Sequence, residues 1–273
     1  MDGKGGRAKQ IWNAYNGSLV CTLPRFQSRD YWDGSLGHAY GVAFSPLVAS
    51  NQLAVAHDSL IRLWQWTNQQ LLWQQNVPGR EVRAVSFSSD GQLLASSDTN
   101  GYIRLWNVST GNLQREISSW GWLYDVKFSP DGNFVIAAEQ QFGSLYLYNA
   151  QSGALHGRLQ GHGGGAYSLA TSSPDDCQPL APPDTPSEPP LMIASGEDKV
   201  ERPFANLWLL PPNIPAGSDI PIHRRYGPHQ GEIRGIAFTG DGQPSSRAVW
   251  TVKSVSGRCP AVCNAFATIR SFL

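Results

Sequence analysis

The segment Ile61-Arg62-Leu63-Trp64 occurs again as Ile103-Arg104-Leu105-Trp106, and a related segment follows at Leu145-Tyr146-Leu147-Tyr148. The closing aromatic residues of these three segments are 42 residues apart. Looser copies lie upstream at Gln10-Ile11-Trp12 and downstream at Asn206-Leu207-Trp208. A fixed period of this length indicates a chain built from structural repeats that stack on one another.

A second marker precedes each closing aromatic by about twenty residues. Its clearest copies are residues 84–91, 125–132 and 235–242, with variants at 41–46 and 168–175. Each copy alternates apolar with small or polar residues and then reaches Ser, Pro, Asp and Gly residues that favour a tight turn. An apolar run, the aromatic segment and a further turn with an apolar run follow. The repeat therefore predicts four short antiparallel strands and an all-β chain.

These repeats resemble those of the WD40 repeat family, whose units of about 40 to 45 residues form four-stranded β-propeller blades. The resemblance covers roughly residues 8–251 and implies about five blades' worth of chain, fewer than this family usually has. The predicted divisions are a partial blade at 8–24, blades at about 38–77, 80–118, 121–160 and 163–224, and a partial blade at 229–251. The two partial blades are complementary and could pair, but an incomplete, open propeller is the favoured prediction.

Three segments depart from the repeat. Residues 172–190 form a Pro-rich, acidic insertion, interpreted as a disordered surface loop rather than as a ligand of an aromatic groove. Residues 211–228 are a second Pro-rich stretch, interpreted as a connection. Residues 252–273 contain no repeat marker, and we expect them to be foreign to the repeat, as a truncated or frameshifted end would be.

Composition and short motifs argue against several classes of partner and activity. The 21 basic and 21 acidic residues cancel, so neither a nucleic acid nor a membrane is an expected partner. No signal peptide or transmembrane run is apparent, which predicts a cytoplasmic protein. Cys259 and Cys263 lack a second ligand pair, so no metal is expected. No catalytic or phosphate-binding motif is present, and neither a cofactor nor enzymatic activity is predicted.

Members of the WD40 family often join the strands of a blade through a histidine, a serine or threonine, an aspartate and a tryptophan. The resemblance assigns this structural tetrad to one blade, as His162, Ser195, Asp198 and Trp208. Counting six residues back from the closing aromatic gives the aspartate position of the three preceding blades, which holds Asp58, Asn100 and Phe142. We interpret these residues as structural rather than catalytic.

One position of the repeat suggests a binding surface. The residues four before each marker phenylalanine, or before Thr171, are Tyr40, Arg83, Tyr124, Tyr167 and Arg234. Their apolar neighbours, Ala39, Val82, Leu123, Ala166 and Ile233, are predicted to face the core. In the WD40 family this part of the innermost strand approaches a face used for partners, and Tyr and Arg are common in binding hot spots. Glu81, Trp120, Trp122 and Glu232 lie up to four residues further upstream and extend the predicted partner-binding set. Packing between neighbouring blades is the alternative role.

The sequence thus predicts a protein-interaction scaffold that binds peptides or protein domains on a propeller face. Two alternatives remain open at this point. One is an enzyme with an active site at the channel mouth, and the other is a gene fragment of a larger regulatory WD40 protein.

Overall fold

The structure is a computed structural model, and it describes residues 10–13, 16–24, 39–77, 81–161, 163–172, 191–197, 204–211, 213–227, 233 and 235–236. Within these ranges every regular element is a β-strand except a short 3-10 helix, η1 (Val48–Ser50). The prediction of an all-β chain is confirmed. Most of the insertion 172–190, most of the partial blade 229–251 and the tail 252–273 lie outside the described residues.

The strands form five sheets, and three of these are simple antiparallel meanders. The N-terminal sheet pairs β1 (Gln10–Trp12) with β2 (Leu19–Thr22). The next sheet contains β3 (Ala39–Phe44), β4 (Gln52–His57), β5 (Leu60–Gln65) and β6 (Gln70–Asn76), and the one after it contains β7 (Val82–Phe87), β8 (Leu93–Asp98), β9 (Tyr102–Asn107) and β10 (Leu113–Ser118).

The last two sheets are linked by one strand, β18, which joins the earlier sheet. One contains β11 (Leu123–Phe128), β12 (Phe134–Glu139), β13 (Leu145–Asn149) and β14 (Leu155–Leu159), and the other contains β15 (Ala166–Ser172), β16 (Leu191–Glu197), β17 (Ala205–Leu210) and β19 (Arg224–Tyr226). Between β17 and β19 the chain forms β18 (Ser218–Ile220), which pairs in parallel with β14 of the neighbouring sheet.

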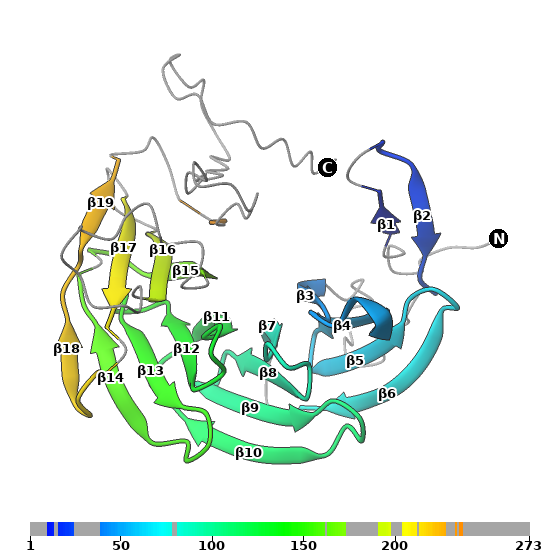
Figure 1. The fold of residues 1–273 in the computed structure, drawn as a ribbon, viewed down its shortest axis with the longest axis horizontal. Coiled ribbons are helices and arrows are strands. Elements are labelled where there is room, and N and C mark those ends of the chain that lie inside the picture. Colours follow the sequence, from blue (N-terminus) through cyan, green and yellow to red (C-terminus); the bar gives the residue numbers. More distant parts are fainter. Residues whose placement is uncertain are drawn as a thin grey trace, which may run out of the picture.

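The sheets stand side by side in an arc, with β3, β7, β11 and β15 on its inner side and β6, β10 and β14 further out (Figure 1). Buried apolar residues fill the space between successive sheets; Ile61 and Leu63 of β5, for example, pack with Val85 of β7 and Leu94 of β8. The sheets do not close into a ring among the described strands, so the predicted open propeller of four-stranded blades is what the structure shows.

The tight turns follow from the Ser-x-Asp-Gly sequence that marks the repeat. Between β7 and β8 the Ser88 hydroxyl donates to Asp90 (2.6 Å) and accepts the N–H of Leu93 (2.9 Å). Gly91 takes a φ of +67°, which glycine adopts without a side-chain clash. Ser129, Asp131 and Gly132 repeat this arrangement between β11 and β12.

The Pro-rich stretch 211–228 is more ordered than a plain connection. It supplies both β18 and β19, so the fourth strand of the last sheet ends at Tyr226 rather than at the predicted boundary of 224. Gly157 permits the close approach of β18, because a Cβ at that position would lie 2.9 Å from the Ser218 carbonyl oxygen. Buried Ile220 then packs among the apolar residues between the last two sheets, which explains why this segment docks.

Candidate functional site

Each inner strand carries a β-bulge at the same point of the repeat. The register with the second strand shifts between Ala39 and Gly41 in β3, and equivalent shifts occur in β7, β11 and β15. The extra residues in the four bulges are Tyr40, Arg83, Tyr124 and Tyr167. A bulge redirects a side chain that strict alternation would place elsewhere. The preceding residues Val82, Leu123 and Ala166 are fully buried, as predicted for the core set.

The four bulge residues contact one another across the sheets, and we call them the inner-strand row. The guanidinium carbon of Arg83 lies 4.3 Å from the ring centroid of Tyr40 and 4.9 Å from that of Tyr124. The rings of Tyr124 and Tyr167 meet edge to face, with their centroids 4.7 Å apart. The row is therefore a continuous line of aromatic and cationic side chains. Arg234 and Glu232, also in the predicted set, lie outside the described residues.

Glu81 neutralises the charge of the row. Its carboxylate accepts the Tyr40 hydroxyl (2.9 Å) and lies 2.5 Å from a terminal nitrogen of Arg83. The side chains of Arg83 and Glu81 keep 23% and 28% of their exposure, so water still reaches them. Such a solvent-accessible ion pair adds little stability, about 0 to 1 kcal/mol. The contacts fix the shape of the row more than they stabilise the fold.

A second group of side chains lies on the loops beside β11, and we call it the aromatic rim: Trp120, Trp122 and Phe142. Their exposed fractions are 64%, 48% and 70%. Trp120 and Trp122 belong to the β10–β11 loop, and Phe142 belongs to the β12–β13 turn. Sequence reasoning named the two tryptophans but considered Phe142 only as a replacement for an aspartate. The signal that could have identified Phe142 is its position in a turn next to the loop that carries the two exposed tryptophans.

Hydrogen bonds hold the β10–β11 loop on both sides. The N–H of Ser119 donates to the Gly101 carbonyl oxygen (2.7 Å), and the Tyr148 hydroxyl donates to the Ser119 hydroxyl (2.7 Å). The N–H of Gln140 donates to the Trp122 carbonyl oxygen (2.9 Å), which joins this loop to the β12–β13 turn. The aromatic rim is thus carried on backbone with a defined conformation.

Glu139 joins the two loops of the aromatic rim. Its side chain is buried, and its carboxylate accepts the N–H groups of Gln141 (2.5 Å) and Phe142 (2.7 Å). The same carboxylate lies against Gly121, where an added Cβ would be 2.5 Å from Oε1. Gly121 has a φ of +63° and separates the two tryptophans. Sequence reasoning did not identify Glu139.

The β7–β10 sheet contains a buried polar network. The indole N–H of Trp106 donates to the Ser96 hydroxyl (2.9 Å), and Asp98 forms an ion pair with Arg104. Asp98 also accepts the N–H groups of Asn100 (2.8 Å) and Tyr102 (3.1 Å). The count from the aromatic residue reaches Asn100, but the carboxylate that accepts the turn's N–H groups is that of Asp98. Asp98 has the role because the end of β8, rather than the turn, brings a carboxylate to the turn's N–H groups.

The predicted tetrad is described only in part. Trp208 on β17 is fully buried, and its indole N–H donates to the Gln160 carbonyl oxygen (3.2 Å). Ser195 lies on β16, and His162 and Asp198 fall outside the described residues. The full tetrad therefore stays a prediction. Asp58, assigned to the equivalent position of an earlier blade, is buried with an oxygen 3.0 Å from His57 Nδ1.

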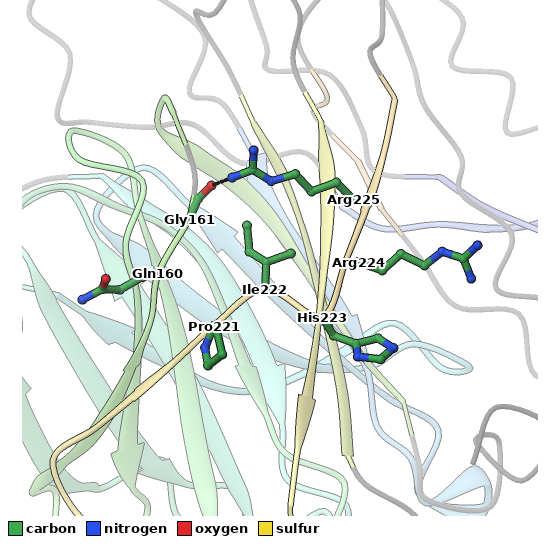
Figure 2. Close-up of a pocket in the computed structure, with 7 residues that line it drawn as sticks. All are labelled: Gln160, Gly161, Pro221, Ile222, His223, Arg224 and Arg225. Atoms are coloured by element: carbon green, nitrogen blue, oxygen red, sulfur yellow. Dashed lines mark hydrogen bonds between the residues drawn. The ribbon is translucent and has the colours of Figure 1, made fainter. Parts of the chain in front are cut away.

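An open pocket of about 530 Å³ lies between the end of β14 and the β18–β19 link. Figure 2 shows Arg225 pointing to Gly161, whose carbonyl oxygen accepts its guanidinium N–H (2.6 Å). His223 and Arg224 extend to the other side of β19. The basic side chains do not converge on one point, so the pocket does not form an anion site.

The part of the chain that the structure describes contains neither a metal-binding cluster nor a membrane-spanning helix. No group of three or more His, Cys, Asp or Glu residues is placed there to hold a metal ion. Among the same residues, no helix has the length and apolar character needed to cross a membrane.

The comparisons with known proteins agree with this fold. Residues 48–122 match the family model for the anaphase-promoting complex subunit 4 WD40 domain. The chain is 34% identical over 106 residues to apoptotic protease-activating factor 1 of Rattus norvegicus, a match that covers 35% of this chain and 8% of that protein. It is 31% identical over 120 residues to WD repeat-containing protein SL1-17 of Schistosoma mansoni, covering 41% of this chain and 38% of the relative.

The chain matches well under two thirds of the length of these relatives. Among solved structures, Kuenenia stuttgartiensis hydrazine synthase superposes with a TM-score of 0.60 at 14% identity, over 75% of this chain and 53% of that one. At this identity the likeness shows the fold alone. Together the repeats, the four-stranded sheets and the matched relatives show that the chain is similar to proteins of the WD40 repeat family.

Proposed function

We propose that this chain is a cytoplasmic protein-interaction scaffold whose partner protein or peptide binds along the inner-strand row. The observation that carries the proposal is the repeated bulge, which brings Tyr40, Arg83, Tyr124 and Tyr167 into one line. A bulge interrupts the ladder, and its repetition in four sheets at one register marks a surface feature rather than a local irregularity.

The chemistry of the row supports binding. Tyr and Arg supply large contact areas with polar ends, and they dominate many interface hot spots. Stacking on two tyrosines holds the Arg83 guanidinium in place, so little side-chain entropy is lost when a partner binds. Packing between blades, the alternative role, is also visible in these contacts, but it leaves Arg83 and Glu81 accessible to water.

Variants of the row test the proposal. In affinity capture from a cell extract, with mass spectrometry of the bound proteins, we expect Arg83→Ala and Tyr124→Ala to lose a partner that the unaltered chain retains. Their melting temperatures should stay close to that of the parent, since each change costs about 1 kcal/mol or less.

Arg115→Ala is the matched control. Arg115 lies on the outer strand β10, where its guanidinium donates to the Ser152 carbonyl oxygen (3.0 Å). This variant should capture the same proteins as the parent. If Arg83→Ala and Tyr124→Ala also leave the captured set unaltered, the inner-strand row is not the binding surface.

A further inference from the structure

We infer that the aromatic rim binds an uncharged, apolar anchor of the partner's peptide segment. The inference rests on the proposed function and adds the chemical class of the ligand. Trp120, Trp122 and Phe142 are all large aromatic side chains, and about half or more of each is exposed. Exposed apolar groups of this size, gathered on adjoining loops, mark sites where a partner removes them from water.

The aromatic rim is held in position before any ligand arrives. Glu139, buried beneath the two loops, accepts backbone N–H groups of the β12–β13 turn and lies against Gly121. The Tyr148 hydroxyl fixes Ser119 at the start of the β10–β11 loop. Tryptophan side chains on such a backbone lose little conformational freedom on binding, which is the condition under which a contact contributes most to affinity.

The charged side chains of the neighbouring strands form ion pairs with one another, and this favours an uncharged ligand. Glu81 pairs with Arg83, and Asp98 pairs with Arg104. Asp125 lies 3.3 Å from Lys127 and accepts the Leu169 N–H (2.8 Å). A charged peptide would find its counter-charges here already paired within the fold, as far as the described residues go, and would lose hydration without compensation. An apolar anchor has no such cost.

The position of the aromatic rim connects it to the inner-strand row. Trp122 lies two residues before Tyr124, where β11 leaves the loop, and β11 is an inner strand of the arc (Figure 1). One extended peptide that places an apolar residue on the rim therefore continues along the row. This placement supports a single binding surface that includes the rim and the row.

Selection of a phage-displayed library of random 12-residue peptides against the full chain tests the inference. We expect the enriched peptides to contain Leu, Phe, Trp or Met and to have a net charge near zero. Their Kd should change less than about threefold between 50 and 500 mM NaCl, because few ionic contacts are screened. A set of strongly charged peptides whose binding falls steeply with salt, or no enrichment at all, overturns the inference.

Substitutions then show which residues of the chain bind the selected peptides. The double variant Trp120→Ala and Trp122→Ala should weaken binding about tenfold or more, and Phe142→Ala should weaken it less. Trp12→Ala is the matched control, because Trp12 is a tryptophan of similar exposure, 55%, on β1 at one end of the arc. Circular dichroism and the melting temperature confirm that each variant folds.

The experiment distinguishes two negative results: that peptides do not bind the aromatic rim, and that partners do not bind the inner-strand row. Peptides that lose affinity with Arg83→Ala, but bind the tryptophan double variant normally, overturn the inference and leave the inner-strand row supported. Peptides that lose affinity with the double variant, but not with Arg83→Ala or Tyr124→Ala, support the rim and argue against the row.

Discussion

Inner strands β3 and β7 occupy the same place in successive sheets, yet their equivalent side chains differ greatly in exposure. Val42 and Phe44 of β3 are 60% and 55% exposed. Their counterparts in β7, Val85 and Phe87, are 1% and 8% exposed. The sequence of the two strands is equally apolar, so the difference arises outside the strand.

The neighbouring sheet accounts for this difference. Val85 and Phe87 pack against apolar residues of the β3–β6 sheet, such as Ala54 and Ile61. On the corresponding face of the β3–β6 sheet, the two-stranded β1–β2 sheet and the segment after it cover Leu53, Val55 and Trp64. In the described part of the chain, no inner strand lies beside β3 on that face. In a propeller, burial of a repeated residue therefore depends on the sheet that follows or precedes it.

The largest expected effect tests this dependence. Phe128 of β11 corresponds to Phe44 and is 4% exposed. We expect Phe128→Ala to lower the free energy of unfolding by about 3 to 5 kcal/mol, because it leaves a cavity between two sheets. Phe44→Ala should cost less than about 1 kcal/mol, since its ring is already in contact with water.

Urea denaturation of the two variants, followed by tryptophan fluorescence, measures both values. An unchanged slope with denaturant is the control, because it shows that the variants unfold the same amount of surface. Equal losses for Phe44→Ala and Phe128→Ala would contradict the comparison, since they would mean that the face of β3 is covered in the folded chain.

A smaller effect is expected from the buried ion pair of the β7–β10 sheet. Asp98→Ala leaves the Arg104 guanidinium buried without its inner carboxylate, and we expect a loss of about 2 to 3 kcal/mol in urea denaturation. The loss stays at the lower end for a broken buried pair, because Glu116 still accepts from Arg104 Nε (2.7 Å).

Glu116→Ala serves as the comparison for that measurement. The side chain of Glu116 is 45% exposed, so its contact with Arg104 is screened by water and its removal should cost less than about 1 kcal/mol. If both variants lose the same stability, burial does not decide the strength of this network.

The repeat predicted the fold because its strands and turns are local features of the sequence. It also placed Tyr40, Arg83 and Tyr124 at one position, although only the structure shows that bulges put them in contact. The carboxylates Asp98 and Glu139 could not be placed by counting back from the aromatic residue. The turns that follow them contain three and five residues, so a fixed count reaches different parts of each turn.

The pairing of β18 with β14 could not be predicted from the sequence either. A parallel pair of this kind depends on contacts between residues that are far apart in the chain. The exposure of Phe142 was missed for a similar reason. Its marker position suggested a lost aspartate, and the longer turn that displays the ring is visible only in three dimensions.

The smallest expected effect concerns the turns that link the first and second strands. In the β7–β8 turn, the Ser88 hydroxyl and then the Gln92 N–H lower the pKa of the Asp90 carboxyl from its ordinary value. The corresponding turn of the first full sheet has Pro46 and Leu47 there and no aspartate. Because the folded pKa of Asp90 is lowered, its contribution to stability is complete above the unfolded pKa of about 4 and is lost as pH falls through the folded value.

Ser88→Ala should therefore raise the pKa of Asp90 toward its ordinary value, which a carbon-detected NMR titration of that carboxyl measures. The variant also loses the hydrogen bond from the Leu93 N–H, but that loss is the same at every pH. Its decline in stability between pH 7 and pH 3 should be slightly smaller than that of the parent chain. Ser45→Ala, in the turn without an aspartate, should show the parent's decline. An Asp90 pKa that Ser88→Ala leaves unchanged would mean that the turn backbone alone sets the pKa.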